Sequence, residues 1–490
     1  MEVLITFTEV IKCPPGKNKA NMKKAVLLFS FFLTLSLASK AQIQLWGMSG
    51  GGGASSEGVI FKCTPSVSSI STVLSFGSDS GARPFGSLIQ GADGYMYGMT
   101  LSGGTSNDGA IFKCTASGSL TTMASFNGKN GSSPYGSLVQ GTDGNLYGMT
   151  VNGGPFDSGE IFQCTPSGII NPIVYFNGEG GIYPYGNLIQ GADGNLYGMT
   201  MYGGGEADSG TIFKCTTSGV LTTLVNFNSR NGGFPYGSLI QGTDGNLYGM
   251  TLYGGASDSG TIFKCTTSGV LTTLVNLNGS TGCYPYGNLI QAFDGNLYGM
   301  TETGGAYNGG TIFKCSTTGV FKAIVDLNDT TGQNPLGSLM QASDSNFYGM
   351  TSSGGGRSGS GTVFQYTPSG NFTVLDRLIG AIFACSPVRQ YGNLLEVNPV
   401  LGINTISTTS KTLVYPNPAS NTLNVLIDIQ ATSNTGVIKI IDITGKEVLS
   451  KNVNISNGQL SIDISAIANG MYFAEVVTNK SKEAFKFVKE

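Results

Sequence analysis

One four-residue phrase, an aromatic residue followed by Gly, Met and Thr or Ser, occurs seven times along this chain. The copies begin at Trp46, Tyr97, Tyr147, Tyr197, Tyr248, Tyr298 and Tyr348, so successive copies lie 50 or 51 residues apart. A period of about 50 residues is typical of propellers and other repeat arrays. The spacing therefore predicts a repeat fold.

Each repeat contains four short segments rich in β-branched and aromatic residues, with turn residues between them. In one copy these segments are 237–241, 247–251, 261–266 and 270–276. Asp-Gly pairs such as Asp143-Gly144 favour tight hairpins between antiparallel strands. We find no long amphipathic window of the kind that helical repeats require. Four antiparallel strands per repeat predict the blade of a propeller.

The two ends of the repeat array complement each other. The first copy, 42–46, lacks the first strand segment, whereas a stray copy of that segment, 391–396, follows the seventh repeat. Closure of the ring by this C-terminal strand would leave no unpaired strand edge between the first and last blades. The predicted fold class is therefore all-β, a seven-bladed β-propeller over 42–397 that a C-terminal strand closes.

Composition excludes several function classes. The net charge is −3 and only 11% of the residues are charged, which argues against a nucleic-acid partner. The chain contains no histidine, which excludes Ser-His and Cys-His catalysis and imidazole-ligated metals. We predict no cofactor and no metal site. At 490 residues the chain is long enough for two or more folded units.

Residues 1–41 are predicted to be a signal peptide region. Two lysines at 23–24 precede an apolar run at 25–38. A run of this length is too short for a typical membrane-spanning helix. We expect Met22 to be the true start, cleavage after Ala41, and no transmembrane segment in the mature chain.

Cysteines recur at one position of the repeat. They are Cys63, Cys114, Cys164, Cys215, Cys265 and Cys315, and the seventh copy has Tyr366 there. Equivalent positions on neighbouring blades should lie about 10 Å apart, because that is the spacing of packed sheets. Disulfides need Cα atoms within roughly 7 Å. We therefore expect buried, unpaired thiols, and we expect Cys283 and Cys385, in loops of non-adjacent blades, to be unpaired as well.

The character of the sequence changes after a polar linker at 398–410. Several short alternating segments over 411–490 predict a small Ig-like β-sandwich. The segment contains Tyr415-Pro416-Asn417-Pro418, then Gly445, then Gly470 and Tyr472, in that order. In these motifs it resembles the type A C-terminal sorting domain of the type IX secretion system. An ordinary Ig-like module is the alternative.

The resemblance implies that the partner is the type IX secretion machinery. It also implies a Bacteroidetes-type origin and export through the general secretory pathway and the periplasm. The expected location is secreted or on the outer-membrane cell surface, and the sorting domain is of a kind that can be cleaved off. The repeats at 46–375 resemble the GloVer tandem repeats of "choice-of-anchor" surface proteins, a resemblance that implies interchangeable C-terminal anchors and no established activity.

Candidate ligand-binding residues lie on one face of the predicted ring. In a meander, the Asp-Gly and Ser-Gly turns share one face, while the Gly-rich loops and the links between blades share the other. The second face varies between copies, and binding usually resides in variable loops on a rigid scaffold. Its aromatic residues are Phe156, Tyr183, Tyr202, Phe234, Tyr253 and Tyr284. Such rings suit sugars, and the alternative is that they cap the blade cores.

Four acidic residues break the repeat, namely Glu160, Glu179, Glu206 and Glu302. Glu179 and Glu206 fall in neighbouring loops of the variable face, and a carboxylate pair can hydrolyse glycosides. Solvated loop acids are far commoner, so we predict no catalytic residue. The Asp residues of the turns are expected to form turns rather than to ligate calcium, and the aromatic residues of the seven-fold phrase to serve packing.

These patterns predict a monomeric binding or adhesion protein for glycan or protein ligands. Two alternatives stay open. One is a carbohydrate-active enzyme, a polysaccharide hydrolase or lyase, on the same scaffold. The other is a structural component of a surface layer.

Overall fold

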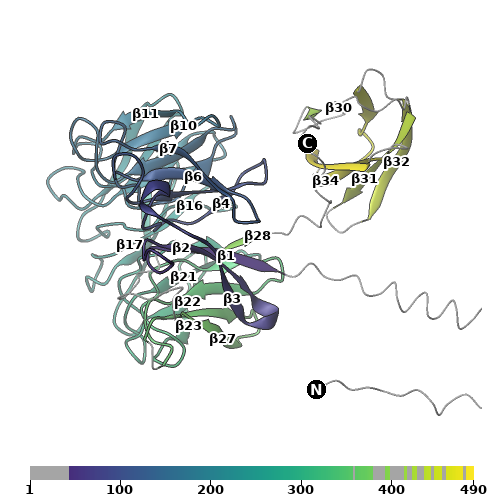
Figure 1. Ribbon diagram of the computed structural model, residues 1–490. Helices are drawn as coiled ribbons and strands as arrows, with labels where there is room; N and C mark the ends of the chain where they lie inside the picture. The colour runs from purple at the N-terminus through teal and green to yellow at the C-terminus, as the bar shows by residue number, and fades with distance from the viewer. Residues whose placement is uncertain are drawn as a thin grey trace, which may run out of the picture. The chain divides into compact units, whose positions relative to one another are not determined.

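The computed structural model describes residues 43–356, 359–378, 392–397, 413–415, 422–426, 435–442, 446–454, 459–468, 470–477 and 482–489. The chain divides into two compact units, one ending at Pro399 and one beginning at Val400. The described residues form thirty-five strands and two short 3-10 helices, η1 (Pro65–Val67) and η2 (Ser78–Ser80) (Figure 1). The all-β prediction is confirmed. The predicted signal peptide region, the start at Met22 and the linker lie outside the described residues.

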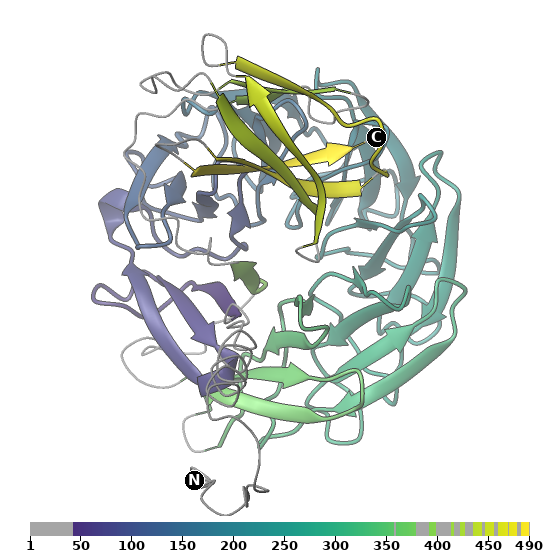
Figure 2. The ribbon, with the colours of Figure 1, turned by 90° about the vertical axis from the view of Figure 1, so that its right-hand side faces the viewer.

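The first unit consists of seven four-stranded antiparallel sheets (Figures 1 and 2). Sheet 1 has the strand order β28 (Leu395–Val397), β1 (Gln44–Ser49), β2 (Val59–Thr64) and β3 (Ser69–Ser75). Sheet 2 contains β4 (Ile89–Gln90), β5 (Met96–Thr100), β6 (Ala110–Cys114) and β7 (Leu120–Ser125), and sheet 3 contains β8 (Val139–Gln140), β9 (Leu146–Thr150), β10 (Glu160–Cys164) and β11 (Ile170–Tyr175). Sheet 4 contains β12 (Ile189–Gln190), β13 (Leu196–Thr200), β14 (Thr211–Cys215) and β15 (Leu221–Asn226).

The remaining three sheets follow the same order. Sheet 5 contains β16 (Ile240–Gln241), β17 (Leu247–Thr251), β18 (Thr261–Cys265) and β19 (Leu271–Asn276). Sheet 6 contains β20 (Ile290–Gln291), β21 (Leu297–Thr301), β22 (Thr311–Cys315) and β23 (Phe321–Asp326). Sheet 7 contains β24 (Met340–Gln341), β25 (Phe347–Met350), β26 (Thr362–Tyr366) and β27 (Phe372–Arg377).

Sheet 1 takes its first strand from the far end of the repeat array. Strand β28 pairs with β1 in antiparallel register, with Gln44 opposite Val397 and Trp46 opposite Leu395 (Figure 1). The predicted pairing of the stray C-terminal segment with the first repeat is therefore confirmed.

Neighbouring sheets share hydrophobic cores, and sheet 1 shares one with sheet 7. Leu45 and Phe61 from sheet 1 belong to the same buried cluster as Tyr348 and Val363 from sheet 7. Sheet 1 also shares a buried cluster with sheet 2, to which sheet 1 contributes Trp46 and sheet 2 contributes Phe112. The first and last sheets are thus packed together, and the view in Figure 2 shows the sheets arranged around a common centre.

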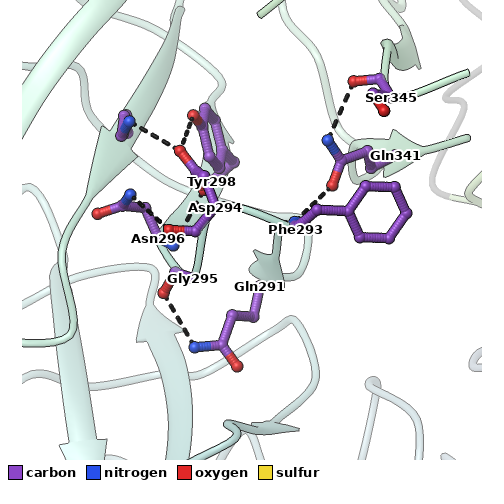
Figure 3. A network of polar contacts seen from close by, with 9 residues as sticks. Gln291, Phe293, Asp294, Gly295, Asn296, Tyr298, Gln341 and Ser345 are labelled. Carbon is purple, nitrogen blue, oxygen red and sulfur yellow. Dashed lines mark hydrogen bonds and ion pairs between the residues drawn. The ribbon is translucent and has the colours of Figure 1, made fainter.

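The aromatic residue of the seven-fold phrase is buried and joined to the adjacent turn. In sheet 4, the Tyr197 side chain is 0% exposed, and its hydroxyl donates to Asp193 Oδ2 at 2.7 Å. Burial and this bond raise the pKa of Tyr197. Five further tyrosines of the phrase donate to the turn Asp in the same way (Figure 3 shows Tyr298 and Asp294).

The first copy departs from this pattern. Trp46 Nε1 is buried without a hydrogen-bond partner, because sheet 1 takes its first strand from the chain end and has no Asp-Gly hairpin between that strand and the next.

The glycine of the phrase is required by close packing. A Cβ added at Gly198 would lie 2.5 Å from Cζ of Phe213, the residue opposite it on β14. The same clash would occur at the other six copies, each against the Phe of the third strand. The expectation that the phrase serves packing is confirmed.

The turn aspartates organise their own hairpins. Asp294 Oδ1 accepts a hydrogen bond from the Asn296 backbone N–H at 3.1 Å, and Lys314 Nζ lies 2.8 Å from Asp294 Oδ2. Partial burial acts to raise the pKa of Asp294, but the hydrogen bonds from Lys314, Asn296 and Tyr298 outweigh it and lower that pKa to about 2. No group of three acidic or cysteine side chains within the described ranges could hold a metal ion.

A closed cycle of seven hydrogen bonds links the sheets at the start of their first strands. The backbone N–H of a Ser or Asn in one sheet donates to the side-chain oxygen of the equivalent residue in the next. In order, Ser87, Ser137, Asn187, Ser238, Asn288, Ser338 and Asn393 are linked at 2.5–2.9 Å, and Asn393 N–H donates back to Ser87 Oγ. The Ser238 backbone N–H therefore bonds to the next sheet rather than to the neighbouring strand of its own sheet. The strand predicted at 237–241 is accordingly confined to Ile240–Gln241.

Glycines beside this cycle allow the sheets to approach. A Cβ added at Gly86 would lie 2.2 Å from the carbonyl oxygen of Gly136, and one at Gly392 would lie 2.4 Å from that of Gly86. Because these contacts are with backbone, no side-chain movement could relieve them.

A second series of bonds joins the Asp-Gly hairpins of adjacent sheets. The Phe293 backbone N–H donates to Gln341 Oε1 at 2.8 Å, and Gln341 Nε2 donates to the Ser345 carbonyl (Figure 3). At the junction of sheets 7 and 1, Glu396 replaces the glutamine and accepts from the Ser343 backbone N–H at 2.8 Å.

The repeated cysteines are buried and unpaired, as predicted. Cys63, Cys114, Cys164, Cys215, Cys265, Cys283 and Cys315 are all free thiols. Burial raises the pKa of Cys265 to about 11. Cys385 lies outside the described residues.

The second unit contains two sheets around one core. Strands β29 (Leu413–Tyr415), β30 (Thr422–Leu426) and β33 (Gln459–Asp463) form the first sheet, and β32 (Glu447–Asn454), β31 (Thr435–Asp442), β34 (Gly470–Val477) and β35 (Lys482–Lys489) form the second. Leu423 and Ile462 from the first sheet share a buried cluster with Ile440 and Val476 from the second. This arrangement agrees with the predicted sandwich.

Asn393 tests the role of the cycle. We expect Asn393→Ala to lower the free energy of unfolding by about 1–3 kcal/mol, because it leaves the Ser338 N–H without an acceptor. The measurement is urea unfolding of the full chain. Asn393→Ser is the matched control, since serine occupies the equivalent place in four sheets, and it should stay near the wild-type value. Equal stability of Asn393→Ala and wild type would contradict a structural role for the cycle.

Candidate functional site

The Gly-rich loops and the links between sheets lie side by side. Isolated bridges pair Ile182 with Tyr202, Gly233 with Tyr253, and Cys283 with Thr303, each joining a link to the loop of the sheet that follows it. We call the surface formed by these loops and links the loop face. It matches the variable face predicted from the turn order.

Five of the six predicted ligand-binding aromatics form one continuous row on the loop face, which we call the aromatic belt. The ring centroids lie 6.2 Å apart for Tyr183–Tyr202, 5.3 Å for Tyr202–Phe234, 5.9 Å for Phe234–Tyr253 and 5.2 Å for Tyr253–Tyr284. Three of these contacts are edge-to-face and one is tilted. The rings come in alternation from the links that lead into sheets 4, 5 and 6 and from the Gly-rich loops of sheets 4 and 5.

The backbone that presents the belt is common to the other repeats. Tyr183, Phe234 and Tyr284 have φ of 55°, 54° and 57°, in the left-handed region. The equivalent residues in three other links, Arg83, Ser133 and Asn334, have φ of 55°, 55° and 52°. Left-handed backbone at a bulky residue costs about 1–3 kcal/mol unless its surroundings hold it. The left-handed backbone is therefore common to all six links, and the belt positions differ from the other links only in their aromatic side chains.

Hydrogen bonds hold each strained link. Phe234 N–H donates to the Ser209 carbonyl at 2.8 Å, and the Phe234 carbonyl accepts from Leu252 N–H at 3.3 Å. Both partners belong to the Gly-rich loops of neighbouring sheets, so the backbone that carries the ring is held from both sides.

The belt is partly open to solvent. The Tyr253 side chain is 37% exposed, and the other four rings are half-buried. Burial and the nearby Tyr284 and Glu302 raise the pKa of Tyr253. Its hydroxyl therefore stays protonated at neutral pH and can both donate and accept a hydrogen bond.

Phe156 is not part of the belt. Its side chain is 59% exposed at the tip of the sheet 3 loop and makes no ring contact among the residues the structure describes. The next residue, Asp157, has φ of 49° and accepts a hydrogen bond from Gly153 N–H, which fixes the loop with Phe156 outward.

The two loop acids lie in adjoining loops, as predicted from the sequence. Gly204 N–H donates to the Gly178 carbonyl at 3.2 Å, which joins the Glu206 loop to the link that contains Glu179. Both carboxylates are exposed, and neither has a hydrogen-bond partner in the described ranges. Neither carboxylate lies in a buried apolar setting like that of the general acid of lysozyme.

Glu160 is the acidic residue that the structure sets apart. Its side chain is 0% exposed, and neither carboxyl oxygen has a hydrogen-bond partner. Burial raises its pKa to about 8. In sheet 4 the equivalent residue is Thr211, whose hydroxyl lies 2.9 Å from Thr200 Oγ1 and 3.2 Å from the Gly180 carbonyl. The sequence marked Glu160 as a break in the repeat, but only the fold reveals its burial.

A pocket at the centre of the loop face was not predicted. It is lined by a set of rings that we call the aromatic collar, Phe85, Tyr135, Tyr185, Tyr236 and Tyr286. Its empty volume is about 340 Å³, including space open to solvent. Tyr185 and Tyr236 stack at 4.8 Å, and Tyr135 lies 5.7 Å from Tyr236. Six residues of the hydrogen-bonded cycle also line it. The sequence signal was the aromatic residue before Gly-Ser or Gly-Asn, which is replaced in one copy by Leu336.

The sorting motif is described only in part. Tyr415 ends β29 and Gly470 begins β34, while Pro416, Asn417, Pro418 and Gly445 lie outside the described residues. Tyr472 is buried, stacks on Phe487 at 5.8 Å and donates to the Ala468 carbonyl. Tyr472 is therefore part of the core of the second unit.

Glu160 makes stability depend on pH. The unfolded-state pKa is near 4.5 and the folded-state pKa is about 8, so the unfolded chain ionises first and stability falls as the pH rises between these values. We expect a loss of about 3–5 kcal/mol in the free energy of unfolding over this range. Urea unfolding at several pH values should show this slope in wild type and in the exposed-acid control Glu206→Ala. It should be absent in Glu160→Thr, and an unchanged slope there would contradict the assignment.

In the part of the chain that the structure describes, no helix is long and apolar enough to cross a membrane. The C-terminal residues 413–490 match the secretion system C-terminal sorting domain. This match identifies the type IX secretion machinery as a partner and a secreted or outer-membrane cell-surface location.

No curated protein matches the chain. A crystal structure of a proposed 6-phosphogluconolactonase from Bacteroides fragilis is 18% identical with a TM-score of 0.49, and the match covers 74% of this chain and 98% of that chain. A second such protein, from Bacteroides uniformis, is 13% identical with a TM-score of 0.46, covering 68% and 95%. A Quinonprotein alcohol dehydrogenase-like protein from Bacteroides thetaiotaomicron is 13% identical with a TM-score of 0.46, covering 68% and 74%. Similarity this distant carries no argument about activity.

The repeats match the family described as Gloeobacter/Verrucomicrobia repeat in three overlapping stretches, residues 35–207, 124–292 and 193–393. Together these stretches cover more than half of the chain. The protein therefore belongs to the Gloeobacter/Verrucomicrobia repeat family.

Proposed function

We propose that this protein is a cell-surface or secreted binding module that recognises glycans with the aromatic belt. The observation that carries the proposal is the continuity of the belt. Five rings, from Tyr183 to Tyr284, follow one another at 5.2–6.2 Å on partly exposed loops. Flat apolar rings with polar edges suit the C–H faces and hydroxyl groups of sugars.

The proposed scaffold is a closed seven-bladed β-propeller over residues 42–397. The unbroken cycle from Ser87 to Asn393 and the core that joins sheets 1 and 7 support it. A closed scaffold would hold the belt rigid, and a preorganised site loses less entropy on binding. We propose further that residues 1–41 are a signal peptide region, that 411–490 form an Ig-like sorting domain, that the organism is of the Bacteroidetes type and that the protein is a monomer.

Belt variants taken from other repeats provide the test. Phe234→Asn places there the residue found at the equivalent Asn334, which has the same left-handed backbone, and Tyr253→Thr copies the equivalent Thr303. A glycan array with the full chain should identify ligands. We expect each variant to weaken binding about tenfold or more, because a buried aromatic contact contributes about 1–2 kcal/mol. Phe156→Ser, which copies Ser257 of the sheet 5 loop, is the control on the same face and should bind as wild type does.

Three results would contradict the proposal. They are silence on all glycans, wild-type affinity in both belt variants, or loss of binding only in Phe156→Ser. The alternative is a carbohydrate-active enzyme, since adjoining loops bring Glu179 and Glu206 onto one face. It would be favoured if the wild type cleaves a bound glycan and Glu179→Gln or Glu206→Gln abolishes that cleavage.

A further inference from the structure

Each side-chain oxygen of the hydrogen-bonded cycle accepts one bond within the cycle, whereas the side-chain donors take no part in it. The acceptors are Oγ of four serines and Oδ1 of three asparagines, and each donor is a backbone N–H from the preceding sheet. Because Oδ1 is committed in this way, the orientation of each asparagine amide is fixed. Its NH₂ group must then point elsewhere.

These remaining hydrogens have no acceptor among the residues that the structure describes. Within the described ranges, no hydrogen bond is donated by Nδ2 of Asn187, Asn288 or Asn393, or by the hydroxyls of Ser87 and Ser238. None of the three amide nitrogens is among the fully buried atoms that lack a hydrogen-bond partner. All five residues line the central pocket. The pocket therefore presents a ring of amide and hydroxyl donors.

The surroundings of the ring carry no formal charge. Among the described residues, the lining consists of the aromatic collar, Leu336, glycines and the Ser and Asn side chains, and none of these is basic or acidic. In the collar, Tyr135–Tyr185 and Tyr236–Tyr286 meet edge to face at 5.1 Å. The amide N–H groups are donors only, so they suit an anion rather than a cation. A single water accepts only two hydrogen bonds, fewer than the ring can donate.

We propose that this ring binds one small anion, a halide or the carboxylate group of a small acid, at the centre of the pocket. Neutral N–H and O–H donors that line one pocket can compensate an anion for the water it loses. An anion held there would contact side chains from several sheets at once. It would therefore stabilise the closed arrangement, since a ligand that binds only the folded state raises its stability.

Two substitutions at Asn187 isolate the site from general salt effects. Asn187→Ser copies Ser137 and Ser238, so it keeps an acceptor for the Ser137 N–H and a donor toward the pocket. Asn187→Asp also keeps the acceptor, but it places a negative charge in the ring and excludes a second anion. Thermal unfolding of the full chain is followed against sodium chloride and, separately, sodium acetate.

We expect chloride, acetate or both to raise Tm by about 2–4 °C more in wild type and in Asn187→Ser than in Asn187→Asp. Which salt acts identifies the source as halide or carboxylate. An equal salt response in all three proteins would overturn the proposal. If Asn187→Asp does not fold, wild-type crystals soaked in bromide decide the matter. An anomalous peak inside the ring supports the site, and peaks only on the outer surface overturn it.

Discussion

The cycle of backbone-to-side-chain hydrogen bonds at the start of the first strands is the interaction on which the rest of the first unit depends. It forms only because glycines let neighbouring backbones come close, as at Gly86 against Gly136. Each bond also fixes the angle between two sheets, since it joins backbone in one to side chain in the next. The last member, Asn393, lies 306 residues from its acceptor, Ser87. The C-terminal segment is therefore as much a part of the ring as any full repeat.

A rigid frame separates what is constant from what varies. The left-handed residue in each link has nearly the same φ in six copies, whether it is Arg83, Ser133, Phe234 or Asn334. The frame thus accepts different side chains without changing the backbone, and a row of aromatics could arise by substitution alone. The seven-fold phrase, by contrast, belongs to the constant part of the frame. Its glycines pack against the Phe of the neighbouring strand, and its tyrosines are buried and donate hydrogen bonds to the turn Asp.

The sequence predicted the features that depend on local pattern and period. The strands, the pairing of 395–397 with the first repeat, the unpaired cysteines and the shared face of links and loops all follow from spacing. It missed features that depend on contacts between repeats. The contacts of the collar and the cycle join residues of different repeats, 50 positions apart for Ser87 and Ser137 and 306 for Asn393 and Ser87. These contacts form only when the sheets pack together. Phe156 was grouped with the other loop aromatics because the sequence shows which residues a loop contains but not where their side chains point. The turn at Asp157 directs Phe156 away from the belt.

Native-state hydrogen exchange tests the closure of the ring most directly. If the seven bonds act as one closed unit, the amide protons of the cycle from Ser87 to Asn393 should all exchange slowly and together, at the rate of global unfolding. The junction between Asn393 and Ser87 should be as well protected as the others. Much faster exchange at Asn393 and Ser338 than at Ser137 and Asn187 would show that the ring opens there, and it would contradict the account.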